Sequence, residues 1–287
     1  MENKKIVTDF AARLNAFRER ERIRNLMDLI PKGGASVLDA GARDGRVSVL
    51  LADHFETVTA LDQNNPTVRH RKVMAVQGDI TSLGFPDNSF DCVICTEVLE
   101  HVPEHLLGRA CSELQRVAGK HLVVGVPYRQ DLRVSRTTCN LCGKKNPPWG
   151  HVNAFDEERL KGLFPGLEIE TISNVSTTRA ATNAVSTLLM DLAGNPYGTY
   201  DQEESCIHCG APLGTPPPRN LFQKGCTRLA FWLNEAQGRF APPRPNWIHV
   251  LFRKPAVSAR AENVKPALRP DIRNRLLATG TSSETRV

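Results

Sequence analysis

The segment VLDAGARDGR, residues Val37–Arg46, decides the fold of this chain. A strand-like apolar run enters Gly41, and a short polar loop leads to Gly45, where a helix is expected to begin. This layout is typical of folds that hold nucleotide-like cofactors. It departs from the dinucleotide pattern G-x-G-x-x-G, because arginines stand at positions 43 and 46. It is not a P-loop either, since no Gly-Lys-Ser/Thr follows.

Strand and helix patterns alternate around this segment. Apolar runs predict strands, and periodic segments between them predict helices. The strands are expected over 36–42, 57–62, 73–79, 90–96, 121–128, 167–175 and 246–254, and the helices over 9–30, 46–55, 102–117 and 156–163. Near-continuous apolar strands separated by helices indicate a parallel sheet that is covered on both faces. The predicted fold class is therefore α/β, with a doubly wound, mostly parallel sheet.

Three carboxylates stand at or near the ends of successive predicted strands. Asp39 precedes the glycine loop, Asp62 ends the strand at 57–62, and Asp79 follows the next strand in "QGDI". A carboxylate at Asp62 can accept hydrogen bonds from both hydroxyls of a ribose. Asp79 is placed to accept from an exocyclic amino group of adenine. Any one of these residues could instead be a solvated strand end or a helix cap.

The ordered set of motifs resembles the class I S-adenosylmethionine-dependent methyltransferases. The family pattern D-x-G-x-G-x-G … D … GD … FD-x-V … E-x-LEH is matched from about Ala35 to Tyr128. The resemblance implies a seven-stranded sheet whose last strand is antiparallel. It also implies S-adenosylmethionine as cofactor, held by residues of the loop and the strand ends: Asp39, Gly41, Arg43, Gly45, Asp62, Asp79, Ile80 and Thr96.

Arg43 is the departure from the family pattern. S-adenosylmethionine carries no phosphate, so close backbone approach matters less than it does for a dinucleotide. The side chain of Arg43 either faces the carboxylate of the methionine moiety in a charge-assisted contact or lies in solvent while its backbone acts.

Two Cys-x-x-Cys-Gly units predict a structural zinc site. Cys139 and Cys142 form the first pair and Cys206 and Cys209 the second, with 63 residues between them. Four thiolates leave no open coordination position, which is typical of structural zinc. Both pairs are expected to follow strands that end at the cofactor edge, so one zinc would join two insertions at about 129–150 and 176–245. Half-sites that share zinc between two chains are the alternative.

The candidates for a general base near the carboxyl edge are His101, His105 and His151, and Tyr128 is a weaker candidate. His101 lies in "EVLEHV" beside the expected cofactor, and His151 follows the first cysteine pair. A base is needed only where the acceptor is a hydroxyl or a protonated amine. Each histidine could instead make a structural hydrogen bond.

Composition sets the wider expectations. The predicted parts are an N-terminal helical extension (1–34), a methyltransferase domain (35–254) and a basic disordered tail (255–287). The tail carries six Lys/Arg and three Asp/Glu, so it supplies +3 of the net charge of +6. With no signal-peptide core and no membrane span, a cytoplasmic location is expected.

The acceptor is expected to be a small molecule, a glycan or a lipid intermediate. An RNA methyltransferase that uses the zinc region and tail is an alternative, as is a non-catalytic module that binds cofactor or a partner. The helix around Leu221, Phe222, Cys226, Leu229, Ala230 and Leu233 is expected to serve as core or as a dimer face.

Overall fold

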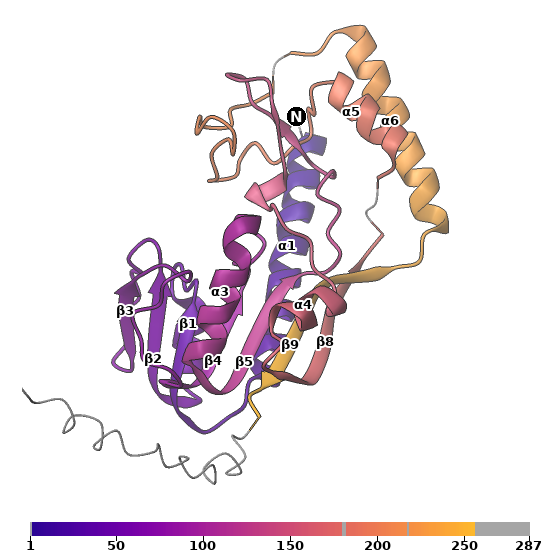
Figure 1. Cartoon of the computed structure of the whole chain (residues 1–287). Coiled ribbons are helices and arrows are strands. Elements are labelled where there is room, and N and C mark those ends of the chain that lie inside the picture. Colours follow the sequence, from indigo (N-terminus) through magenta and orange to yellow (C-terminus); the bar gives the residue numbers. More distant parts are fainter. Residues whose placement is uncertain (1, 180–181, 217, 256–287) are drawn as a thin grey trace, which may run out of the picture. The chain divides into compact units, whose positions relative to one another are not determined.

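The computed structural model describes residues 2–179, 182–216 and 218–255. A seven-stranded sheet with the order β3-β2-β1-β4-β5-β9-β8 forms its centre (Figure 1). The strands are β1 (Gly34–Ala40), β2 (Phe55–Asp62), β3 (Val73–Gln77), β4 (Phe90–Thr96), β5 (Ala118–Pro127), β8 (Glu168–Thr178) and β9 (Arg244–Arg253). Neighbouring strands from β3 to β5 pair in parallel, whereas β9 is antiparallel to both β5 and β8. The predicted fold class, with its antiparallel last strand, is confirmed.

Helices cover both faces of this sheet, and each face has its own apolar core. On one face α3 (Glu104–Val117) and α4 (Glu157–Leu163) contribute Leu107, Leu114 and Leu160. On the other face α1 (Glu2–Leu29) and α2 (Arg46–Leu51) contribute Leu26 and Leu51. Consecutive strand residues alternate between the two cores, as a pleated strand that is buried on both sides requires.

Several predicted helix boundaries were wrong by a few residues. The helix expected over 46–55 ends at Leu51, because Ala52–His54 turn directly into β2. The helix expected from Val102 begins at Glu104, after Pro103, which fixes the backbone at the helix entry. The N-terminal helix begins at Glu2 rather than at Asp9.

Two insertions rise from the carboxyl edge of the sheet. The first follows β5 and contains the short hairpin β6 (Thr137–Thr138) and β7 (Lys145–Asn146) and the turn η1 (Pro148–Gly150). The second follows β8 and contains α5 (Ala184–Leu192) and α6 (Leu221–Phe240), which pack against each other. Asn183 and Asn220 cap these helices with reciprocal side-chain hydrogen bonds.

A first compact unit ends at Pro255. The whole sheet belongs to the first unit. The predicted tail lies outside the described residues, apart from Pro255. Among the helices that the structure describes, none is both long enough and apolar enough to span a bilayer.

Candidate functional site

A cavity of about 870 Å³ opens where β1 and β4 end side by side. In the strand order β2-β1-β4, chain connections leave β1 and β4 in opposite directions along the sheet, so this is the switch point where α/β folds bind ligands. The two insertions and α1 supply its other walls. Lining residues include Arg22, Asp39, Gly41, Arg43, Thr96, His101, Tyr128, Gln130, Trp149, His151 and Trp247.

The glycine loop is held in left-handed backbone conformations. Gly41 has φ +89° and Gly45 has φ +75°, and a Cβ at either position would collide with Val98 or Val68. Arg43 also has positive φ, +48°, so it adopts a conformation that the family pattern provides with glycine. Its backbone N–H donates to Asp62 Oδ2 (2.9 Å), which ties the loop to the end of β2.

The guanidinium of Arg43 points to the second insertion. It donates to Glu203 Oε2 at 2.6 Å, and both side chains are largely exposed. Of the two interpretations made from the sequence, this arrangement is closer to the one in which the side chain is in the solvent and the backbone acts.

Asp39 is a buried carboxylate in the floor of the cavity. The Ser48 hydroxyl donates to its Oδ2 at 2.5 Å. Burial raises the pKa of Asp39 to about 6, the hydrogen bond from Ser48 opposes this rise, and the negative charge of Asp62 adds to it.

The other predicted cofactor residues lie at the same edge but not in the cavity wall. Asp62 ends β2 and accepts from the Asn64 N–H, and Asp79 follows β3 and accepts from the Thr81 N–H (2.8 Å). Gly45, Asp62, Asp79 and Ile80 do not line the cavity. Their contact with a cofactor stays a prediction.

The structure brings two of the predicted histidines together. The rings of His101 and His151 meet edge to face with centroids 4.6 Å apart. The first insertion is responsible, because the Val152 N–H donates to the Glu100 carbonyl and the Asn153 amide donates to the Leu99 and Val102 carbonyls. Residues far apart in the sequence thus become neighbours beside the cavity.

Burial favours the neutral form of both imidazoles. Burial lowers the pKa of His151 to about 3, and the nearby His101 adds to this effect. Burial also lowers the pKa of His101, although the charge of Glu204 opposes this and Arg43 reinforces it. Gln130 Oε1 accepts from His151 Nδ1 at 2.6 Å, so Nε2 keeps the free lone pair of that ring.

Glu100 is a site residue that the sequence analysis did not single out. Its side chain is fully buried, and neither carboxyl oxygen has a hydrogen-bond partner among the described residues. Burial and the charge of Glu97 raise the pKa of Glu100 well above its usual range. A carboxyl oxygen of Glu100 and one nitrogen each of His101 and His151 lie within 4.8 Å of one another, so the trio is also able to hold a metal ion. In the sequence, the position of Glu100 directly before His101 in "LEH" could have indicated that it belongs to the site.

Comparison with known proteins shows which protein family one part of this chain resembles. Residues 38–121 match the family model described as a methyltransferase domain. The chain contains a methyltransferase domain. This segment carries Asp39, the glycine loop, the ends of β2 and β4 and His101.

The curated relatives match only part of this chain. The ubiquinone biosynthesis O-methyltransferase of Xanthomonas campestris pv. campestris is 37% identical over 97 residues, which are 30% of this chain and 41% of that protein. The chain thus spans about two fifths of the length of that curated relative. A putative methyltransferase from Bacillus halodurans C-125 has a TM-score of 0.48 at 16% identity, covering 82% of this chain and 99% of its own. The 1,6-didemethyltoxoflavin-N1-methyltransferase of Burkholderia thailandensis has a TM-score of 0.48 at 12% identity, covering 88% and 87%.

The four predicted zinc ligands lie outside the matched segment of the methyltransferase domain and converge. Cys139 and Cys209 Sγ are 3.7 Å apart, as are Cys142 and Cys206 Sγ, and all four sulfurs lie within 4.8 Å of one another. A tetrahedral site with Zn–S bonds of about 2.3 Å needs sulfurs about 3.8 Å apart. In each unit the glycine N–H donates to the carbonyl of the first cysteine at 2.9 Å. The geometry therefore fits one zinc within one chain.

The four remaining cysteines are buried, as predicted. Cys92 and Cys95 lie in β4 and face the two different apolar cores, and Cys111 and Cys226 are buried in α3 and α6. His208 is exposed and contacts the Lys145 carbonyl through Nε2 (3.0 Å).

Proposed function

We propose that this protein uses S-adenosylmethionine to methylate a small-molecule, glycan-linked or lipid-linked acceptor. The observation that carries the proposal is the cavity at the switch point. Its wall joins the glycine loop and Thr96 to two histidines, and it is built on a methyltransferase domain. Its volume of about 870 Å³ is within the range of about 300–1,000 Å³ that is usual for small-molecule and cofactor sites.

The residues at the sheet edge fit the cofactor. When bound, S-adenosylmethionine supplies a methyl group on a positively charged sulfur. The loop from Gly41 to Gly45 would border it, Asp62 and Asp79 would accept hydrogen bonds from its hydroxyl and amino groups, and Thr96 would close the site at the end of β4. Ile80 would pack against its base.

We assign His101 as the group that takes a proton from the acceptor. Glu204 opposes the effect of burial at His101, so this imidazole is the better proton acceptor of the two. His151 Nε2 would accept a hydrogen bond and orient the acceptor, since Gln130 fixes the tautomer of the ring. A proton on His101 would lie close to the Glu100 carboxyl, which has no other partner in the described structure.

A hydroxyl acceptor suits this arrangement best, because an alcohol or phenol must lose its proton during methyl transfer. The curated relatives are named O-methyltransferases.

A cytoplasmic location is consistent with eight cysteines that are all free of disulfides.

Calorimetry with S-adenosylmethionine tests the cofactor assignment. Wild-type protein should bind the cofactor, and Asp62→Asn should weaken binding at least tenfold because it removes a charged acceptor. Asp53→Asn, at an exposed position before β2, is the matched control and should bind like wild type. Absence of wild-type binding would refute the proposal.

Turnover tests the histidine assignment. Release of S-adenosylhomocysteine is measured against a panel of hydroxylated small molecules, glycan-linked and lipid-linked acceptors. His101→Asn should keep cofactor affinity and lose about 10²–10⁴-fold in kcat. His105→Asn, exposed at the start of α3, should retain activity.

We also propose that zinc fills the four-cysteine site and fastens the two insertions together. A hydrogen bond already joins the two insertions, because the Ile207 N–H donates to Asn146 Oδ1 (2.9 Å). Metal analysis of purified protein should find about one zinc per chain. Cys139→Ser should lose the metal and lower the melting temperature, whereas Cys226→Ser should keep the metal. Full metal retention in Cys139→Ser would contradict the assignment.

A further inference from the structure

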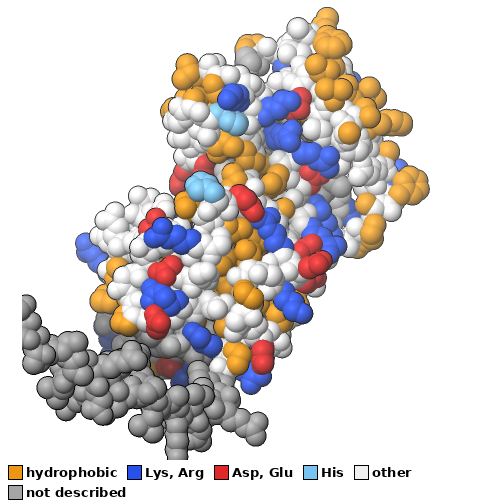
Figure 2. Space-filling view, viewed as in Figure 1, with side chains coloured by type: hydrophobic (Ala, Val, Ile, Leu, Met, Phe, Trp, Pro, Cys, Tyr) orange, Lys and Arg blue, Asp and Glu red, His pale blue; other side chains and the backbone are white. Residues whose placement is uncertain are grey.

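Helices α5 and α6 present large apolar side chains to solvent. Figure 2 shows apolar side chains gathered over this region of the second insertion. On α6, Leu221 is 85% exposed, Phe222 67%, Trp232 64% and Phe240 87%. On α5 the exposed residues are Val185, Leu188 and Leu192, which recur at helical spacing. Exposed aromatic and aliphatic side chains gathered in this way mark an interaction surface.

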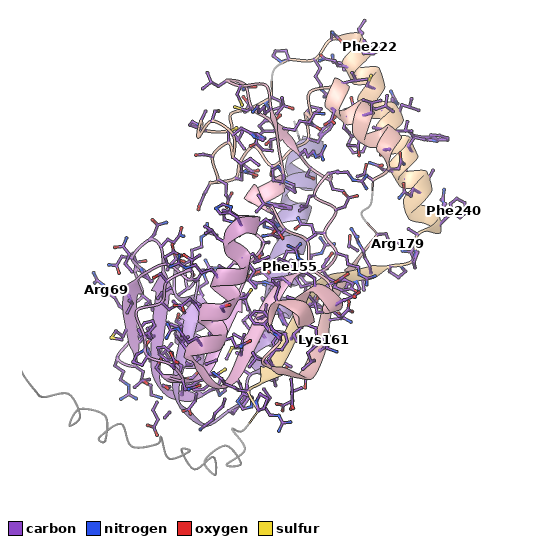
Figure 3. The ribbon with its side chains drawn as sticks, in the orientation of Figure 1. Arg69, Phe155, Lys161, Arg179, Phe222 and Phe240 are labelled. Carbon is purple, nitrogen blue, oxygen red and sulfur yellow. The ribbon has the colours of Figure 1, made fainter. Side chains whose placement is uncertain are left out.

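The apolar core of the molecule does not account for these residues. The buried side of α6 consists of Cys226, Thr227 and Ala230, so the helix faces the protein with small side chains. Of the stripe that the sequence predicted as core or dimer face, only Cys226 and Ala230 are buried, whereas Leu221, Phe222 and Leu229 are exposed. The large side chains therefore point away from the fold, and Figure 3 shows Phe222 and Phe240 near the two ends of α6.

A basic stripe runs beside the exposed apolar side chains. Lys224, Arg228 and Arg239 are exposed on α6, where Glu235 is the single acidic residue. Leu221, Leu229, Trp232 and Phe240 recur at intervals of three to eight residues along the same helix, next to that stripe. Apolar and aromatic side chains beside Lys and Arg are the arrangement of helices that lie in the plane of a lipid interface.

We propose that the exposed face of α5 and α6 binds the surface of a membrane that contains anionic phospholipid. The apolar and aromatic side chains would enter the boundary between headgroups and acyl chains, and the three basic residues would contact lipid phosphates. The attachment is peripheral. It is independent of whether the chain transfers methyl groups.

The charge pattern favours this partner over a second copy of the chain. In a two-fold symmetric dimer the same patch meets itself, so the basic stripes of both copies would lie close together with few acidic residues to balance them. An anionic lipid surface instead complements the whole stripe.

Vesicle co-sedimentation with the full chain tests the proposal. Vesicles of phosphatidylcholine alone are compared with equal mixtures of phosphatidylcholine and phosphatidylglycerol. Wild type should bind the anionic vesicles, and raised salt should weaken binding. The double variant Phe222→Ser/Phe240→Ser should bind at least tenfold more weakly, because two aromatic rings no longer enter the interface. Met74→Ser, at a 57% exposed apolar position on β3, is the matched control and should bind like wild type.

Two further measurements separate the outcomes. Subtracting the emission spectrum of Trp232→Phe from that of wild type gives the emission of Trp232. Its maximum should shift to shorter wavelength when anionic vesicles are added. The double variant Phe222→Ser/Phe240→Ser should keep the wild-type melting temperature, since both altered side chains are exposed. The proposal is overturned if wild type binds neither kind of vesicle, or if Met74→Ser loses as much binding as the double variant. It is also overturned if light scattering finds a dimer that Phe222→Ser/Phe240→Ser dissociates while vesicle binding is absent.

Discussion

Asp39 is a buried carboxyl group beside the proposed cofactor site, and its ionisation affects folding stability. Its folded pKa of about 6 lies above the value of about 3.9 in an unfolded chain. The folded state therefore holds the proton more tightly, and the stability gained below about pH 4 is lost as the pH rises through 6. At pH 7.5 the ionised, buried carboxylate costs about 3 kcal/mol.

We therefore predict that Asp39→Asn stabilises the protein at pH 7.5. The neutral amide removes the cost of burying a charge, and its oxygen can still accept from Ser48. Urea unfolding should show a gain of about 1–3 kcal/mol at pH 7.5 that disappears below pH 4. Asp44→Asn, at an exposed residue of the same loop, should change stability by less than about 0.5 kcal/mol. A loss of stability in Asp39→Asn at pH 7.5 would show that the charge is better solvated than its burial implies.

Cavity-lining residues that belong to short local motifs were predictable from the sequence. Gly41, Arg43 and Thr96 line the cavity because a strand end and the loop after it occupy the same place wherever this sheet forms. The closeness of His101 and His151 depends on the Asn153 amide and on the path of a whole insertion. Nothing local in the sequence encodes that distance. Glu100 escaped notice for a related reason, since its lack of a partner is a property of its surroundings.

At the scale of elements, helix α1 is attached to the sheet through a buried histidine. His249 in β9 contacts Asn25 Oδ1 through Nδ1 (2.8 Å), and the Asn25 amide donates to the Ser173 hydroxyl in β8 (2.7 Å). Burial lowers the pKa of His249 to about 3, and the charge of Arg22 adds to this. Protonation of His249 is therefore opposed only while α1 is docked and the protein is folded.

This arrangement predicts sensitivity to acid. The folded pKa lies below the unfolded value of about 6.5, so the stability contributed by neutral His249 is present above pH 6.5 and is lost as the pH falls towards 3. The slope is at most about 1.4 kcal/mol per pH unit for each such histidine. In urea unfolding at pH 7.5 and 5.0, His249→Gln should reduce the loss on acidification. The double variant His151→Gln/His249→Gln should reduce it further. An unchanged loss in both variants would mean that other groups govern acid unfolding.

The sheet strands and the places of the two insertions were predictable, whereas the short hairpin inside the first insertion was not. Buried parallel strands are apolar throughout, so their runs stand out, and the predicted strand 90–96 coincides with β4. The two-residue strands β6 and β7 carry no such pattern, because the hairpin around Cys139 and Cys142 holds them. The role of α1 as a wall of the cavity also depends on a distant contact, between Arg22 and Glu97 (3.8 Å).

At the scale of the whole molecule, the last described strand ends close to the boundary of the first compact unit. The first compact unit closes at Pro255, two residues after the end of β9. Residues 255–287 supply +3 of the net charge of +6, since they hold six basic and three acidic residues. Half of the net charge therefore lies in residues 255–287, which come after β9.

Truncation after Pro255 should therefore lower the net positive charge without changing cofactor binding. The shortened protein keeps every strand and cavity residue that the structure describes, so its melting temperature should stay within about 2 °C of wild type and its affinity for S-adenosylmethionine within about twofold. Fluorescence anisotropy with a random-sequence RNA at 50 and 200 mM salt gives the second readout. Any RNA affinity of the full chain should fall with salt and drop further on truncation, because fewer cations meet the phosphates. Methyl transfer to RNA that disappears with residues 256–287, while transfer to small acceptors is absent in both forms, would instead make RNA the substrate and those residues part of its binding site.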